Sequence, residues 1–181
     1  RNQQPGAVIV GSHVAKTTQQ LNTLLKMPGI FAMEVDVERI DSDRDALLKQ
    51  VIAQCEQAHV NGQTPVVYTS RTEKTFADQA TRLAFGERVS AFLMDVVKNL
   101  PKGIGFLISK GGITSNDVLS TGLALRAARV LGQILPGCSV VRCPPDHPRY
   151  PDLPVVIFPG NVGDAKALAL VYGRLTGHQS M

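Results

Sequence analysis

Two consecutive glycines followed by hydroxyl residues are the sharpest chemical signal in the sequence. Gly111 and Gly112 come one residue after an apolar run, and Thr114 and Ser115 open a segment of helical period. A backbone without Cβ atoms can approach a ligand closely, and the free amides at the start of a helix attract anions. Lys110, directly before the pair, could add positive charge. The loop predicts a phosphate-binding site; the alternative is a tight turn capped by Thr114 or Ser115.

A second candidate loop follows the first apolar run of the chain. Ser12 comes after Gly11, and a segment with apolar residues on one face begins a few residues later. A hydroxyl at the end of a strand can bind a phosphate or ribose oxygen beside the anion-attracting helix start. The alternative is a plain turn in which Ser12 or Thr17 caps the helix. His13 could serve as a general base, although a histidine in a loop is more often only solvated.

A third candidate loop follows the last apolar run. Gly160 and Gly163 permit a close approach of the backbone to a ligand, and Asn161 could fix a base or a ribose. Asp164 is more typical of a residue that caps the last helix. The segment Ser70-Arg71-Thr72 is a weaker candidate of the same kind. No metal site is predicted, because the one spacing of cysteines and a histidine that suggests zinc lacks a fourth ligand.

Strand-length apolar runs alternate with longer segments of helical period along the whole chain. We expect strands at 7–10, 30–37, 65–69, 104–109, 138–141 and 155–158, and helices at 16–27, 41–60, 74–100, 115–131 and 164–175. This alternation predicts a three-layer, Rossmann-like α/β domain with a mainly parallel sheet of about six strands. The three loops would then lie beyond the carboxyl ends of the strands, where such sheets bind their ligands. Residues 1–181 form a single domain in this interpretation.

Composition excludes several other classes of protein. The chain has 181 residues, of which 44% are hydrophobic, and no apolar run is long enough to span a membrane. Three cysteines without a close pair favour free thiols and a cytoplasmic location. The net charge of +4 is too small to imply nucleic acid, but residues 98–149 carry +5 and the rest of the chain −1. We interpret this concentration as a local field for an anionic ligand near Lys110.

The three loops together resemble a known family. Gly11-Ser12 with Thr17-Thr18-Gln19-Gln20, the Gly-Gly-x-Thr-Ser loop, the turn at 135–137 and Pro-Gly-Asn-x-Gly at 159–163 occur in this order. The pattern resembles the C-terminal nucleotide-binding domain of the four-carbon acid sugar kinases, which include 3-oxo-tetronate and threonate kinases. The resemblance implies ATP with Mg²⁺ as the ligand and a sugar acid whose hydroxyl is phosphorylated. It covers essentially the whole chain.

The resemblance also assigns roles to residues. Ser12 should contact the nucleotide, the backbone of Gly111, Gly112, Ile113 and Thr114 should wrap its phosphates, and Gly160, Asn161 and Gly163 should close the other side. The substrate pocket and the catalytic base would belong to an N-terminal domain of a longer two-domain kinase, with a homodimer allowed. The alternative from another class is a non-catalytic module that senses phosphosugars or nucleotides. A nicotinamide-dependent dehydrogenase is disfavoured, because no GxGxxG follows the first apolar run.

Overall fold

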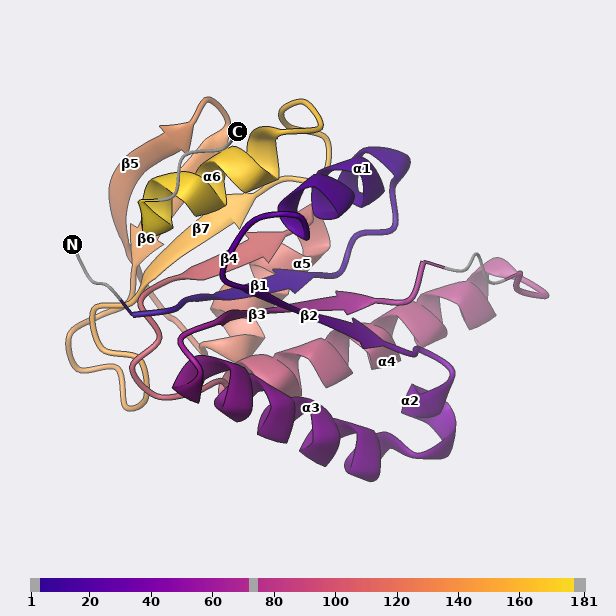
Figure 1. Cartoon of the computed structure of the whole chain (residues 1–181). Helices are drawn as coiled ribbons and strands as arrows, with labels where there is room; N and C mark the ends of the chain where they lie inside the picture. Colours follow the sequence, from indigo (N-terminus) through magenta and orange to yellow (C-terminus); the bar gives the residue numbers. More distant parts are fainter. Residues whose placement is uncertain (1–3, 72–74, 178–181) are drawn as a thin grey trace.

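A seven-stranded sheet forms the centre of the molecule in the computed structural model, which describes residues 4–71 and 75–177 (Figure 1). The strands lie in the order β2-β3-β1-β4-β7-β6-β5. Their bounds are β1 Ala7–Val10, β2 Ile30–Val35, β3 Thr64–Thr69, β4 Leu107–Lys110, β5 Arg129–Leu135, β6 Cys138–Arg142 and β7 Pro154–Phe158. The prediction of a mainly parallel sheet is confirmed, with one strand more than expected.

The five neighbouring strands β2, β3, β1, β4 and β7 are parallel, and their carboxyl ends meet at one edge of the sheet. Val10 is paired with Lys110 and with Tyr68, and Lys110 is paired with Phe158. The loops that follow β3, β1, β4 and β7 therefore leave the sheet at nearly the same level. β6 runs antiparallel to both β7 and β5, so β5 points in the same direction as the parallel strands.

Helices cover both faces of the sheet. On one face α1 (Ala15–Leu24) packs against α6 (Ala167–Thr176). On the other face lie α3 (Arg44–Val60), α4 (Gln79–Lys98), α5 (Gly112–Asp117) and the short π-helix η1 (Val118–Gly122), with α2 (Arg39–Ser42) at one end (Figure 1). The three-layer architecture predicted from the alternating pattern is confirmed.

Alternating side chains of β1 show why the sheet needs both layers. Ile9 belongs to the hydrophobic core under α3 and α4, whereas Val8 and Val10 belong to the core under α1 and α6. All three side chains are fully buried. Strands that are buried on both faces read as continuous apolar runs, and this is why 7–10, 65–69 and 155–158 could be recognised as strands from the sequence.

The predicted helix over 115–131 is wrong in its second half. The helical segment begins at Gly112 and ends with η1 at Gly122, and residues 129–135 form strand β5. Ala124 has φ of 50°, and a residue in the left-handed region cannot continue a right-handed helix. The predicted turn at 135–137 connects β5 to β6 as a hairpin, with Gly137 at φ of 79°.

The long helix predicted over 74–100 begins later than expected. Position 74 lies outside the described residues, and α4 starts at Gln79 after Asp78, whose side chain accepts a hydrogen bond of 2.7 Å from the Thr81 amide. An aspartate in this position satisfies one of the free amides of the first turn. Within 4–71 and 75–177, none of the helices has the length and apolar character needed to cross a lipid bilayer.

Candidate nucleotide site

The loops after β1 and β4 lead to opposite faces of the sheet, so the sheet has a topological switch point between these two neighbouring strands, and we refer to this place as the crevice. β1 is followed by α1 on one face, whereas its neighbour β4 is followed by α5 on the other. Ligands of parallel α/β sheets bind at such a switch point, beyond the carboxyl ends of the strands. The same division separates β7, which leads to α6 beside α1, from β4 (Figure 1).

The glycines of these two loops allow a close contact between them. A Cβ on Gly11 would lie 2.3 Å from Thr114 Oγ1, which is closer than real Cβ atoms approach. Gly111 has φ of 123°, and a Cβ there would lie 3.1 Å from the Cβ of Ser12. Gly112 is different, because a Cβ there would meet nothing within 4 Å. Gly11 and Gly111 are therefore needed for packing between the loops, whereas the backbone of Gly112 faces open space.

Neither helix that begins at the crevice is capped by a side chain. The position before α1 is held by Val14, and the position before α5 by Gly111. The alternatives in which Ser12, Thr17, Thr114 or Ser115 caps a helix are therefore wrong. Ten-residue α1 leaves first-turn amides for another acceptor, and an anion is the acceptor that such amides favour.

The Ser12 hydroxyl has its acceptor positions occupied by this protein's own groups. Its oxygen accepts hydrogen bonds from Thr17 Oγ1 at 3.2 Å and from the Val14 amide at 3.5 Å. A serine hydroxyl has one hydrogen to donate and two lone pairs. Thr17 Oγ1 also lies 3.4 Å from the carbonyl oxygen of Gly160, so the hydroxyls of Ser12 and Thr17 form one network with the loop after β7. The hydroxyl also lies near Gly160, where a Cβ would be 3.6 Å from Ser12 Oγ.

Polar side chains of α1 hold the loop after β7 in place. Gln20 Nε2 donates to the carbonyl oxygens of Val162 at 2.9 Å and of Asp164 at 2.8 Å. Lys16 Nζ donates to the carbonyl oxygen of Asn161 at 3.1 Å. Thr17 and Gln20 are both fully buried. These roles were not predicted from the sequence, although two polar residues at the beginning of the buried stripe that continues with Leu21 are a recognisable signal.

Lys110, at the end of β4, also binds the loop after β7. Its Nζ donates to the carbonyl oxygens of Pro159 at 2.6 Å and Gly160 at 3.2 Å, and it lies 4.2 Å from the centre of the Phe158 ring. The side chain is fully buried, and this burial lowers the pKa of Lys110 to about 8. The expected supply of charge to a ligand thus competes with two hydrogen bonds inside the protein.

The remaining predicted residues take different positions. Ile113 is 79% exposed, and Asn161 is exposed as well. Ser115 is buried, and its hydroxyl donates to the carbonyl oxygen of Ser109 at 2.9 Å. Gly163 has φ of 76°, and a Cβ there would lie 2.3 Å from the Cβ of Ala167. The structure therefore gathers Ser12, Gly111, Gly112, Thr114 and Gly160 at the crevice and turns Ser115 into the core.

Arg71 and His13 form a second polar cluster beside Ser12. Arg71 Nη1 donates to the carbonyl oxygen of Ser12, while its Nε and Nη2 are buried and have no partner among the described residues. Burial lowers the pKa of Arg71. His13 Nε2 lies 3.2 Å from Thr69 Oγ1, and burial and the charge of Arg71 lower the pKa of the imidazole. His13 is therefore neutral at neutral pH.

The crevice offers backbone amides and hydroxyls and few carboxylates. Within the described ranges, no group of three or more histidine, cysteine, aspartate or glutamate side chains could hold a metal ion. Amides, a hydroxyl and nearby cations are the donors that bind phosphate groups in proteins. The arrangement fits a phosphate-bearing ligand whose metal ion, if one is bound, is held mainly by the phosphates.

Comparison with known proteins agrees with this geometry. Residues 7–168 match the profile of the family described as nucleotide-binding C-terminal domain. The chain belongs to this family. The nucleotide-binding C-terminal domain thus extends over both glycine loops, the cluster at Arg71 and the loop after β7. No curated protein is similar enough in sequence to match the chain.

Solved structures share the fold of this nucleotide-binding C-terminal domain. A DUF1537 protein from Bordetella bronchiseptica, described as a domain-swapped dimer with bound citrate, superposes with a TM-score of 0.75 at 17% identity over 98% of this chain. A second crystal form of it gives 0.68 at 16% identity over the whole chain. A protein from Salmonella typhimurium LT2, described as a putative tRNA synthase, gives 0.64 at 21% identity over 92%. This chain spans only 40–42% of those chains.

Proposed function

We propose that the chain is the ATP-binding domain of a kinase that phosphorylates a hydroxyl of a small, four-carbon sugar acid, as in 3-oxo-tetronate and threonate kinases. The observation that carries the proposal is the crevice between β1 and β4, where the glycine loop that leads to α5, with its open position at Gly112, contacts the loop that holds Ser12. Membership of a nucleotide-binding family supports a nucleotide as the ligand. The loop sequences support the narrower assignment.

The chemistry of such a kinase suits the groups present. Phosphoryl transfer requires mainly positioning and stabilisation of charge on the phosphate oxygens. The Gly112 amide and the Ser12 hydroxyl would hold the phosphates, whereas the Gly111 amide already donates to the carbonyl oxygen of Phe158 at 2.9 Å. Mg²⁺ bound to those phosphates would offset their charge. The two hydrogen bonds from Lys110 and those from Gln20 hold the Gly160 loop in a fixed position at the crevice.

The sugar acid and the base that activates its hydroxyl are assigned to another domain of the same polypeptide. The solved relatives are more than twice as long as this chain, which leaves room for a substrate domain of at least equal size. The Bordetella protein is described as a domain-swapped dimer. We therefore extend the proposal to a homodimer in which this domain meets a substrate domain over the crevice.

Nucleotide binding is tested by titrating the chain with Mg-ATP and following heat and thermal stability. Saturable binding is expected, and Gly112→Asp should abolish it, because a carboxylate placed in this open position would repel phosphates. The matched control is Gly86→Asp, since Gly86 lies in α4 and a Cβ there also meets nothing within 4 Å. Equal loss in both variants, or no binding by the unchanged chain, contradicts the proposal.

The kinase step is tested with the longer polypeptide that contains this chain. Transfer of the γ-phosphate from ATP to a panel of four-carbon sugar acids is expected, and Gly112→Asp should remove it. A thermal-shift panel distinguishes the sensing alternative: stabilisation by sugar phosphates without stabilisation by ATP or ADP would favour a regulatory module.

A further inference from the structure

The positive charge of segment 98–149 lies mostly at the edge of the sheet opposite the nucleotide crevice. Lys98 ends α4, and Lys102 precedes β4. Arg129 begins β5, Arg142 ends the antiparallel β6, and Arg149 lies in the loop before β7. Each of these positions is at the amino end of the parallel strands, and only Lys110 is at the carboxyl end. The interpretation of this charge as a field around the Gly111 loop is therefore wrong.

Part of this charge is used within the protein. Lys98 Nζ forms an ion pair of 3.0 Å with Asp95. Arg149 donates to the carbonyl oxygen of Leu100 at 2.7 Å and to the Tyr150 hydroxyl at 2.8 Å. Arg129 and Arg142, by contrast, have no side-chain hydrogen bond and no ion pair with any described residue. Both side chains are exposed.

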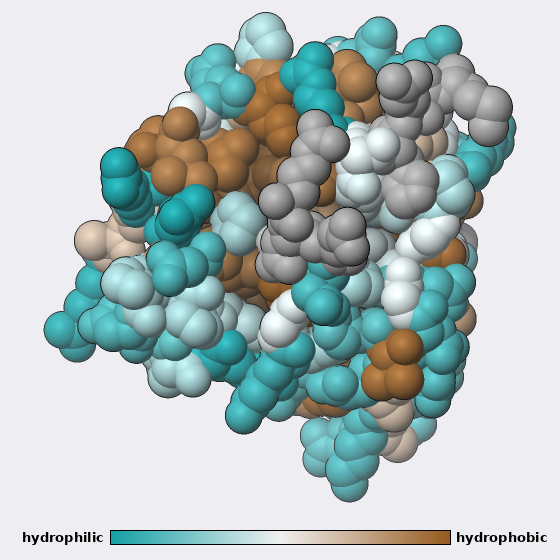
Figure 2. Space-filling model, turned by 60° about the vertical axis from the view of Figure 1, so that its left-hand side comes forward, coloured by the Kyte–Doolittle hydropathy of each residue, from teal (hydrophilic) through white to brown (hydrophobic). Residues whose placement is uncertain are grey.

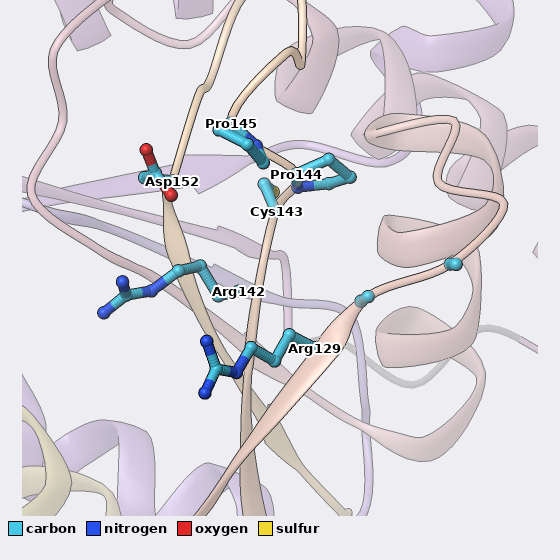
Figure 3. A pocket seen from close by; sticks show the side chains of 8 residues that line it. Arg129, Arg142, Cys143, Pro144, Pro145 and Asp152 are labelled. Carbon is cyan, nitrogen blue, oxygen red and sulfur yellow. The ribbon is translucent and has the colours of Figure 1, made fainter.

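Arg129 and Arg142 are placed directly opposite each other. They are Cα partners in the antiparallel ladder of β5 and β6, so their Cβ atoms lie on one face at a separation of roughly 5 Å. Figure 3 shows the two side chains leaving adjacent strands and extending in the same direction. Like charges directly opposite each other destabilise a sheet. A bound anion would remove this repulsion.

A cavity of about 500 Å³ lies at this pair, a volume suited to a small molecule. Besides the two arginines, its lining includes Asp152 and the apolar side chains of Ala127, Pro144 and Pro145. Cys143 also lines it, and burial raises the pKa of its thiol to about 11, so the thiol adds no charge. Two arginines and one aspartate therefore line the cavity, and its net charge is positive at every pH near neutrality.

Space-filling shows that this side of the domain is not a uniformly charged surface. The side of the molecule that carries β5 and β6 in Figure 1 faces the viewer in Figure 2, where hydrophobic and hydrophilic residues form separate areas. Val130 and Leu131 of β5 are 68% and 43% exposed. The arginine pair thus lies beside exposed apolar residues as well as polar ones, as a small-molecule site requires.

We propose that this cavity is a second binding site, for a small dianion that presents carboxylate or phosphate oxygens to Arg129 and Arg142. Guanidinium groups bind such oxygens through two parallel hydrogen bonds. Asp152 faces the same cavity and selects ligands that bring a hydroxyl or another donor beside their anionic groups. The site is at the opposite edge from the nucleotide crevice, so the proposal does not depend on the proposed kinase function.

The test is calorimetry with this chain at low salt, using inorganic phosphate in one arm and succinate in the other to separate phosphate from dicarboxylate ligands. Saturable binding is expected in at least one arm, weakening as salt is added. Arg129→Gln and Arg142→Gln should each weaken it about tenfold or more, which is the loss expected for a charge-assisted bidentate contact. Arg142→Lys should recover only part of the loss, because lysine keeps the charge without the planar fork.

Two control variants distinguish direct contact with the ligand from a general effect of the protein's charge on affinity. Arg126→Gln removes the same charge from an exposed residue that does not line the cavity, and should leave the affinity nearly unchanged. Asp152→Asn should strengthen binding, since it removes the opposing carboxylate; asparagine tolerates the φ of 57° at this position. Absence of binding in both arms overturns the proposal, as does an equal effect of Arg126→Gln. Loss of Mg-ATP binding in Arg129→Gln would place the arginines in the nucleotide site and overturn it too.

Discussion

The ammonium of Lys110 lies 2.6 Å from the carbonyl oxygen of Pro159, so the last residue of β4 fixes the loop that follows β7. The end of β4, whose loop leads to α5 on one face of the sheet, is thereby tied to the loop after β7, which leads to α6 on the other face. The proposed nucleotide site includes both loops, so the bonds that join them should govern both its geometry and its stability.

The burial of Lys110 makes the stability of the protein depend on pH in a particular window. Its pKa is lowered from 10.5 to about 8 in the folded protein. Between these values the unfolded chain binds more protons than the folded one, so stability gains from this residue as pH rises from about 8 towards 10.5. Denaturant unfolding at several pH values should show this gain in the free energy of unfolding of the unchanged protein. The gain should be absent in Lys110→Met. Lys166→Met, at an exposed position, is the control and should keep it.

Gly11→Ala should destabilise the protein by ~1–3 kcal/mol, because its Cβ would lie 2.3 Å from Thr114 Oγ1. Thr114→Ala removes that atom, and the double variant should be more stable than the sum of the two single effects predicts. Gly86→Ala, in the exposed part of α4, should instead stabilise the protein by ~0.5–1 kcal/mol. Denaturant unfolding measures all four variants. Additive effects of the first two substitutions would contradict the contact.

Gln20→Leu should loosen the loop after β7. It leaves the carbonyl oxygens of Val162 and Asp164 without their donor, at a cost of ~1–3 kcal/mol. Hydrogen exchange should become faster in residues 160–166, and Mg-ATP affinity should fall in parallel. Gln19→Leu is the matched control, since Gln19 is exposed one position earlier on α1. Unchanged exchange in Gln20→Leu would show that these bonds do not hold the loop.

Arg71→Gln should raise the pKa of His13 without restoring it to 6.5. Burial is the larger cause of the lowered imidazole pKa, and the charge of Arg71 is the smaller one. Removing that charge therefore recovers only part of the shift. An NMR titration of the His13 ring measures it, with Arg82→Gln as a control of equal charge at an exposed position on α4. No change in the titration would exclude an interaction between the two side chains.

The sequence was sufficient for the parallel core of the fold, because strands such as β1 and β7 are buried on both faces and appear as continuous apolar runs. It was not sufficient for β5, whose first five residues are exposed and which follows a segment rich in alanine and leucine. Nothing local to Ala124 indicates that its backbone is left-handed.

For the candidate site, the glycine loops could be found because glycines after an apolar run interrupt both strand and helix and so mark the end of a strand. The direction of side chains was not predictable in the same way. Lys110 lies next to Gly111 in sequence, yet its ammonium binds carbonyl groups 49 and 50 residues away. The same holds for the charge of Arg129 and Arg142, which only the strand order places at the far edge of the sheet.

The hydrogen bonds between α1 and the loop after β7 have a consequence for synthesis on the ribosome. Lys16 and Gln20 find their partners 142–145 residues later in the chain. A nascent chain that ends before residue 164 can form β1 to β4 and yet lacks the segment that closes the crevice. Nucleotide binding should therefore begin only after the loop that follows β7 has been synthesised, so that the ligand stabilises nearly finished domains and no shorter nascent chains.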